Sequence, residues 1–155
     1  MTVWLYQMNA KRPLEDGDFY TPDDYQAEVE SEEYLEWLTR EVRPKEVEPK
    51  AGDTIFYWFV AAGTDQPGLY GLGIIFGCYE CPEYNTEHKC IEHLPVSPSE
   101  ILRDNPIYDD EAQEIVNEIR GTQTAFATMF AIDDNHTQRL FAKIQECDEL
   151  EQDSE

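Results

Sequence analysis

The segment of residues 48–73 reads EPKAGDTIFYWFVAAGTDQPGLYGLG and says more about the fold than any other part of the chain. A Gly-Asp turn at residues 52–53 leads into an aromatic and β-branched run over residues 54–60, which is typical of a strand. A polar loop follows, and then a second strand near residues 69–76, which glycines interrupt. The pattern predicts a hairpin that offers flat aromatic faces beside glycines, where a ligand or another backbone can approach closely.

The length and composition suit one domain with one core, because the chain has 155 residues and 41% of them are hydrophobic. We expect this domain to cover residues 1–147 and the acidic segment 148–155 to be a disordered tail. The start lacks the features of a secretory signal, and the longest apolar run, over residues 55–62, is too short to span a membrane. A cytoplasmic location without membrane contact is expected, where cysteines are usually reduced, metal-bound or inert.

The chain is strongly acidic, with 34 acidic and 11 basic side chains and a formal net charge of −23. Such a surface repels phosphate at long range and disfavours anionic membranes. Three explanations stay open: a solvated or salt-adapted acidic surface, a mimic of nucleic acid, and a local neutral or basic face that the total conceals. Residues 40–50 are consistent with the third, because they hold four basic and three acidic side chains.

The first half of the chain mixes predicted strands and helices. A first strand, buried on both faces, is expected over residues 3–6, and Thr21 followed by Pro22 is a good helix start. An apolar stripe with Trp37 at its edge predicts a second helix over residues 31–42, which Pro44 ends. Residues 77–93, which carry most of the cysteines and histidines, are expected to be irregular.

The second half continues in the same way. Residues 97–100 form a capping box that opens a short helix, and a further helix is expected from Asp109 to a C-cap at Gly121. A strand over residues 122–130 and a last helix over 133–147 follow. Because strands and helices do not alternate regularly, the pattern predicts an α+β fold, and the strand glycines suit a sharply curved sheet or small barrel.

Three blocks of sequence occur in an order that a known family shares. These are Trp4-Leu5 with Gln7 and Asn9 closing the strand, residues 51–58 followed by 67–73, and residues 101–107 followed by Arg120-Gly121-Thr122. Together they extend over about residues 3–145, and they resemble the EVE branch of the PUA-like superfamily, which is related to the YTH domains.

The resemblance implies a small mixed β-barrel (PUA-like) wrapped by short helices, with a cleft for a modified nucleobase of DNA or RNA. It also implies which residues line that cleft: Gln7, Asn9, Trp37, Tyr57, Trp58, Gly121 and Thr122. Gln123 departs from the family, in which Asn usually follows the Gly-Thr pair.

The aromatic residues also have a packing explanation. Residues 56 and 58 share one face of a strand and residues 57 and 59 share the other, so at least one aromatic face belongs to the core. Gln7 and Asn9 can equally cap or turn the chain. In a cleft, stacking would contribute about 1–3 kcal/mol per base, and amides would read the base edge because they both donate and accept.

A Cys-x2-Cys pair, Cys78 and Cys81, precedes a Cys-x2-His pair, Cys90 and His93, with His88 between them. Two such pairs can converge on one tetrahedral zinc ion, and four protein ligands would make that site structural. The alternative is that Cys78 belongs to a strand and that the other residues lie in a loop.

No Gly-rich phosphate loop, nucleophile elbow or zinc-protease motif occurs, so no catalytic role is expected. The prediction is a binding module for a modified base or nucleotide in an aromatic-lined cleft, without a required cofactor. The alternative from another class is an acidic scaffold that binds a basic protein partner or mimics nucleic acid.

Overall fold

The computed structural model describes residues 1–8, 22–31, 35–39, 42–43, 47–60, 67–80, 89–96, 106–121 and 129–153. The elements in these ranges are β1 (Val3–Met8), α1 (Pro22–Ser31), β2 (Leu35–Thr39), β3 (Val42–Arg43), β4 (Thr54–Phe59), β5 (Gly68–Glu80), β6 (Lys89–Val96), α3 (Asp110–Arg120), β7 (Met129–Ile132) and α4 (Asp134–Asp153). The predicted α+β class is confirmed.

The strands form one mixed sheet in the order β2-β6-β5-β4-β1-β7-β3. The pairs β1–β4 and β3–β7 are parallel, and the other pairs are antiparallel. The two edge strands are consecutive in the chain, and the Cα atoms of Thr39 and Val42 can be at most about 11 Å apart. The sheet therefore curls back on itself as the predicted barrel requires, but among the described residues no ladder between β2 and β3 closes it.

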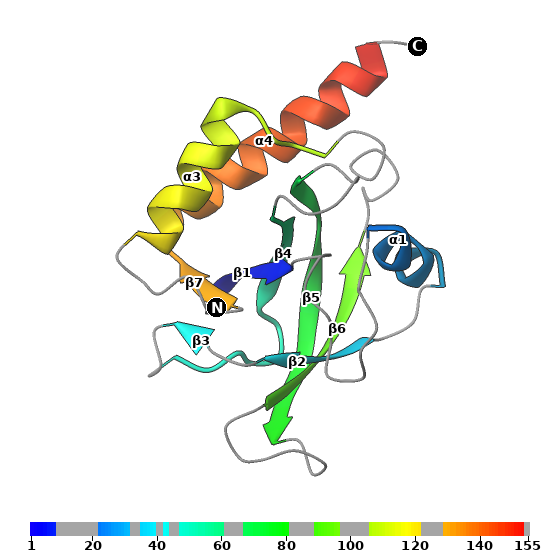
Figure 1. Cartoon of the computed structure of the whole chain (residues 1–155), viewed down its shortest axis with the longest axis vertical. Helices are drawn as coiled ribbons and strands as arrows, with labels where there is room; N and C mark the ends of the chain where they lie inside the picture. The colour runs from blue at the N-terminus through cyan, green and yellow to red at the C-terminus, as the bar shows by residue number, and fades with distance from the viewer. Residues whose placement is uncertain are drawn as a thin grey trace.

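Helices cover the sheet on two sides (Figure 1). Helices α3 and α4 lie side by side over one face, and α1 lies on the other side of the sheet. Alternate residues of β4 follow this division, because Phe56 and Trp58 belong to the core beneath α3 and α4, whereas Tyr57 and Phe59 belong to the core that includes Tyr25 of α1. β4 is therefore buried on both faces.

The Gly-Asp turn has a structural role. The buried carboxylate of Asp53 accepts hydrogen bonds from the Trp4 indole Nε1 at 3.0 Å, the backbone N of Lys50 at 2.9 Å and the backbone N of Thr2 at 3.1 Å. These bonds tie the start of β1 to the turn before β4. The motif thus sets the parallel register of the two strands, from Val3 opposite Thr54 to Met8 opposite Phe59.

The predicted hairpin of β4 and β5 is confirmed, and its glycines do permit a close approach. A Cβ atom on Gly71 would collide with the hydroxyl of Tyr25, and one on Gly73 would collide with the hydroxyl of Tyr57. The groups that use this space are therefore the protein's own tyrosines.

The predicted helix over residues 31–42 is wrong. Helix α1 ends at Ser31, and the chain then forms β2 and β3. β2 pairs along its whole length with β6, from Leu35 opposite His93 to Thr39 opposite Lys89. Local periodicity does not reveal this long-range pairing, which outweighs the helical pattern of the apolar residues.

The irregular segment predicted over residues 77–93 is also wrong at both ends, because β5 continues to Glu80 and β6 begins at Lys89. A bulge between Ile75 and Gly77 lets the two long strands stay paired. β7 lies at Met129–Ile132, so it extends beyond the predicted end at residue 130, and residues 122–128 lie outside the described residues.

The predicted starts of α1, α3 and α4 are confirmed. α1 begins at Pro22, and Asp109 caps α3 by accepting a hydrogen bond from the backbone N of Ala112 at 2.8 Å. α4 begins at Asp134 as expected but runs to Asp153, through most of the segment that we expected to be a disordered tail. The predicted capping box at residues 97–100 lies outside the described residues. None of the described helices is both long and apolar enough to cross a bilayer.

Candidate functional site

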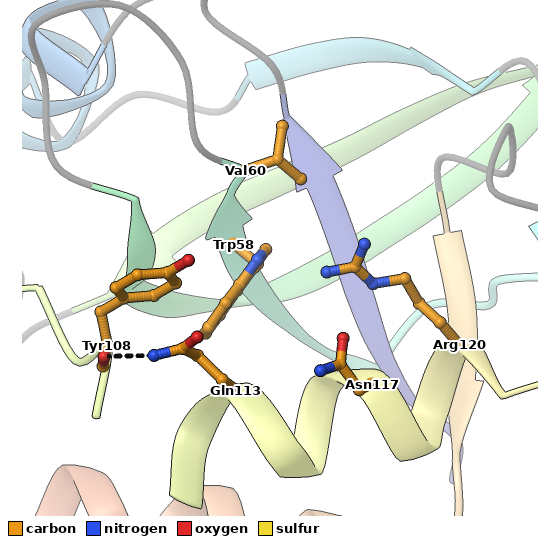
Figure 2. Close-up of a pocket in the computed structure, with 6 residues that line it drawn as sticks. All are labelled: Trp58, Val60, Tyr108, Gln113, Asn117 and Arg120. Carbon is orange, nitrogen blue, oxygen red and sulfur yellow. Dashed lines mark hydrogen bonds between the residues drawn. The ribbon is translucent and has the colours of Figure 1, made fainter. Parts of the chain in front are cut away.

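A pocket of about 220 Å³ lies where the end of β4 meets helix α3. Figure 2 shows its lining, which consists of Trp58, Val60, Tyr108, Gln113, Asn117 and Arg120. Trp58 and Val60 come from the end of β4 and the residue after it, Tyr108 precedes α3, and the other three side chains come from α3 itself. The pocket therefore combines aromatic rings with amide and guanidinium groups.

Helix α3 presents a polar edge to this pocket. Gln113, Asn117 and Arg120 follow one another at spacings of four and three residues, which places them on one side of a helix. The buried positions of the same helix, Ala112, Ile115, Val116 and Ile119, pack into the core beside Phe56 and Leu5. One helix thus anchors itself with one face and supplies polar side chains with another.

The two aromatic rings differ in exposure. Trp58 is 2% exposed and Tyr108 is 40% exposed, and their ring centroids lie 5.9 Å apart at an interplanar angle of 46°. Tyr108 is held from both sides, because Ile107 pairs with Leu69 of β5 and Gln113 Nε2 donates a hydrogen bond to the Tyr108 carbonyl at 2.9 Å. The pocket therefore has a rigid inner ring and a second ring that is open to solvent.

Gln7 is the neighbour of Trp58 in the sheet. The two residues are opposite one another in the parallel pairing of β1 with β4. Since Trp4 and Tyr6 face one core and Leu5 faces the other, alternation places Gln7 on the Leu5 and Trp58 face. The Oε1 atom of Gln7 is buried and has no hydrogen-bond partner among the described residues. A hydrogen-bond acceptor is thus available on the face that carries Trp58.

Arg120 is the cation of the pocket. Its side chain is half-buried, and its Nε atom is buried without a hydrogen-bond partner in the described part of the chain. Burial lowers the pKa of the guanidinium, and the nearby Tyr108 hydroxyl partly offsets this effect. The charge of Arg120 is therefore held where water hydrates it poorly.

The opposite face of β4 holds Tyr57, which was predicted to share a cleft with Trp58. Tyr57 is fully buried, and its hydroxyl forms a 2.7 Å hydrogen bond with Nδ1 of His93. Burial, with smaller contributions from Tyr25, Glu28 and Tyr6, raises the pKa of Tyr57. Burial also lowers the pKa of His93 to about 3, so the imidazole is neutral. Tyr57 does not line the pocket, because consecutive strand residues point to opposite faces.

The other predicted cleft residues are placed only in part. Gly121 caps the end of α3 directly after Arg120, and Trp37 lies in β2 at an edge of the sheet. Asn9 and Thr122 lie outside the described residues. Sequence reasoning missed five lining residues as candidates: Val60, Tyr108, Gln113, Asn117 and Arg120. The spacing of the polar residues of α3 could have indicated the last three of these. Gln113, Asn117 and Arg120 recur every three or four residues beside the buried positions of the helix, and Arg120 begins the Arg-Gly-Thr block.

The predicted zinc ligands are also placed in part. Cys78 packs against the core that contains Ile91, and His93 is buried and bonded to Tyr57. Cys90 pairs with Tyr79 across the β5–β6 ladder, and Cys81 lies outside the described residues. Among the described residues, no group of three or more His, Cys, Asp or Glu side chains is arranged to hold a metal ion. The zinc site stays a prediction, which metal analysis and thiol titration of the purified protein test.

No protein-family model and no curated protein matches the sequence. Three solved structures are similar in fold. Human THYN1, solved in complex with DNA containing 5-methylcytosine, gives a TM-score of 0.55 at 13% identity, over 92% of this chain and 96% of that one. A Pseudomonas putida protein gives 0.55 at 12% identity over 90% and 97% of the two chains, and a Leishmania major protein gives 0.52 at 13% over 94% and 96%. The chain thus shares the fold of THYN1, an EVE-domain protein, and the predicted resemblance is confirmed for the fold.

Proposed function

We propose that this chain is a non-catalytic module that binds one modified nucleobase, carried by DNA, RNA or a nucleotide, in the pocket that Trp58, Tyr108 and the polar edge of α3 line. The observation that carries the proposal is the composition of this pocket, in which two aromatic rings lie beside the amides of Gln113 and Asn117. Its volume of about 220 Å³ is below the range of about 300–1,000 Å³ typical for drug-sized ligands, so it suits a single planar ring system.

Stacking on an aromatic side chain provides affinity for any of the bases. One base stacked on an aromatic side chain gains about 1–3 kcal/mol, and a buried methyl group on that base adds roughly 0.8 kcal/mol. Removing a base from its own stack costs a few kcal/mol, roughly, so stacking must be supplemented by hydrogen bonds to the base edge. Trp58 is buried and rigid, so its side chain loses little conformational entropy when a base binds.

The polar groups around the rings can supply that supplement. Asn117 offers both a donor and an acceptor, and the buried Oε1 of Gln7 is an acceptor on the Trp58 face. The shared fold with THYN1 supports the same kind of ligand, since that protein was solved with methylated DNA. 5-Methylcytosine is therefore the first base to test.

The test is isothermal titration calorimetry with a panel of modified and unmodified nucleosides and short oligonucleotides, using the wild type, Trp58→Ala and Tyr57→Phe. Trp58→Ala should weaken binding by about 1–3 kcal/mol because it removes the stacking surface. Tyr57→Phe, on the opposite face of the same strand, should leave the affinity unchanged. Equal affinity of a folded Trp58→Ala variant would contradict the proposed site, and no binding of any panel member by the wild type would contradict the function.

A second function, binding of a basic protein partner, is favoured by a different surface. Ile74, Phe76 and Tyr79 of β5 are 40%, 43% and 38% exposed. An apolar strand surface on a chain with a net charge of −23 suits a partner with positive charge around an apolar centre. Phe76→Ser should weaken such a complex without changing nucleoside binding. A pull-down with a basic protein measures the first effect, and the calorimetry above measures the second.

A further inference from the structure

We infer that Arg120 forms an anion subsite of the Trp58 pocket, where its guanidinium binds the phosphate of the nucleotide whose base stacks on Trp58. This inference rests on the proposed function and adds to it the chemical class of the ligand. The module would bind a phosphorylated nucleotide more tightly than the corresponding neutral nucleoside.

The first support is that the charge of Arg120 is not compensated. The chain holds 34 acidic side chains, yet Arg120 forms no ion pair with any carboxylate among the described residues. Its Nε atom is buried without a partner there. Partial burial of an unpaired charge is costly, and a site that retains such a charge is more stable when a ligand supplies the missing anion.

The second support is the contrast with the cations of α4. Arg139 Nη1 donates to Glu118 at 2.8 Å, and Lys143 is paired with Asp109 as well as with Glu111 at 3.4 Å. Burial opposes the charged form of Lys143, but the hydrogen bond and charge of Asp109 raise its pKa overall. The chain therefore neutralises partly buried cations on α4 with its own carboxylates, whereas among the described residues no carboxylate pairs with Arg120 in the pocket.

The third support is the position of Arg120. It is the last residue of α3 and lies across Trp58 from Tyr108, as Figure 2 shows. A basic residue in the last turn interacts favourably with the helix carbonyls, but this effect is screened and does not satisfy the buried Nε. A base against Trp58 would thus share the pocket with the Arg120 guanidinium.

Phosphate is the anion that best fits these groups. The guanidinium presents donors in a planar fork that matches two phosphate oxygens, and such charge-assisted bonds are about twice as strong as neutral ones. A nucleotide carries a phosphate next to its base by covalent structure. The overall charge of −23 limits the affinity for polymers, because each further phosphate meets long-range repulsion.

The test compares 5-methylcytidine with 5-methylcytidine 5′-monophosphate by calorimetry, with the other nucleoside and monophosphate pairs of the panel measured alongside. The wild type should bind the monophosphate of the recognised base about tenfold or more tightly than the nucleoside. Arg120→Gln should reduce the ratio of monophosphate to nucleoside affinity to about one, and Arg120→Lys should restore part of that ratio because the charge returns without the fork.

Arg139→Gln is the matched control, since it removes the same charge from a helix outside the pocket and should retain the full monophosphate advantage. An equal affinity of the wild type for nucleoside and monophosphate would overturn the inference while leaving the proposed function intact. The same holds if Arg120→Gln keeps the advantage, with folding checked by circular dichroism. If neither ligand of any pair binds, the proposed function fails and the inference fails with it.

A third comparison decides whether the phosphate belongs to a polymer or to a free nucleotide. A single-stranded trinucleotide with the recognised base at its centre is compared with the monophosphate at low salt. Both ligands should lose the same factor on Arg120→Gln if the backbone phosphate of a polymer can occupy the subsite. If the trinucleotide binds more weakly and is insensitive to Arg120, the subsite takes a free nucleotide.

Discussion

The two faces of β4 carry similar residues and do different things. On one face, Tyr57 is fully buried, bonded to His93 and fitted against the hollow that Gly73 leaves. On the other face, Trp58 is also buried, with 2% of the residue exposed, but it borders a pocket with Tyr108, Asn117 and Arg120. Aromatic content alone therefore does not mark a binding site. The difference lies in what surrounds each ring: His93 and the backbone at Gly73 on one side, and a pocket with amide and guanidinium groups on the other.

The largest expected effect tests the closed packing around Tyr57. Gly73→Ala places a Cβ against the Tyr57 hydroxyl and at 2.8 Å from the Leu94 carbonyl oxygen, and a backbone atom cannot move aside easily. We expect a loss of about 3 kcal/mol in the free energy of unfolding, measured by urea denaturation. Gly77→Ala, on the same strand with no atom within 4 Å of the added Cβ, is the control and should change stability little. Similar stability of both variants would contradict the close fit.

The next effect concerns the pH dependence that His93 gives to the Tyr57 face. Its pKa is about 3 in the folded chain, against about 6.5 in an unfolded chain, so between these values the unfolded state binds the extra proton. Stability should therefore fall as the pH falls below about 6.5, by at most about 1.4 kcal/mol per pH unit, or about 2 kcal/mol by pH 5.

Urea denaturation at pH 5, 6 and 7 measures this dependence before most carboxylates titrate. His93→Gln should flatten it, and Trp58→Ala on the other face should keep it. If His93→Gln retains the full wild-type slope, the buried neutral imidazole is not its source.

A smaller effect separates the roles of the two aromatic residues. Tyr57→Phe removes the hydrogen bond to His93 and should cost about 1 kcal/mol of stability, measured by thermal or urea unfolding. It should not change nucleoside affinity. A weaker affinity with unchanged stability would instead place Tyr57 in the binding site, as the family resemblance implied.

The smallest effect tests the polar edge of α3. Asn117→Ala removes one hydrogen-bonding group from the pocket and should weaken nucleoside binding about fivefold, while stability changes by no more than about 0.5 kcal/mol. Asn135→Ala, at an exposed position of α4, is the control. Calorimetry that shows the same affinity for both variants would remove Asn117 from the site.

The fold was largely predictable where local signals agree with long-range pairing. Asp109 and Pro22 start helices as expected, and the aromatic run after Asp53 forms the central strand β4. The helix predicted over residues 31–42 failed because pairing of β2 with β6 is invisible in local periodicity. The long strands β5 and β6 were underestimated for the same reason, since a bulge and a partner strand extend them.

The candidate site was predictable only in its strand residues. The family resemblance named Trp58 and Gln7, which both lie near the ends of their strands. Tyr108 and Arg120 lie beside Trp58 only because α3 packs near the end of β4, which a sequence does not show. The family resemblance placed Tyr57 in the same cleft as Trp58, although alternation along a strand sends the two residues to opposite faces.

The most direct test of the central claim is a titration of ¹⁵N-labelled protein with 5-methylcytidine 5′-monophosphate and the rest of the panel, observed at the indole N–H resonances. If the base binds on the Trp58 face of β4, one ligand should shift the Trp58 indole resonance in a saturable manner. The Trp4 resonance, whose N–H donates to Asp53 at 3.0 Å in the other core, should stay in place. A saturable shift of Trp4 without Trp58, or no shift of Trp58 with any ligand that calorimetry shows to bind, would contradict the assignment of the binding face.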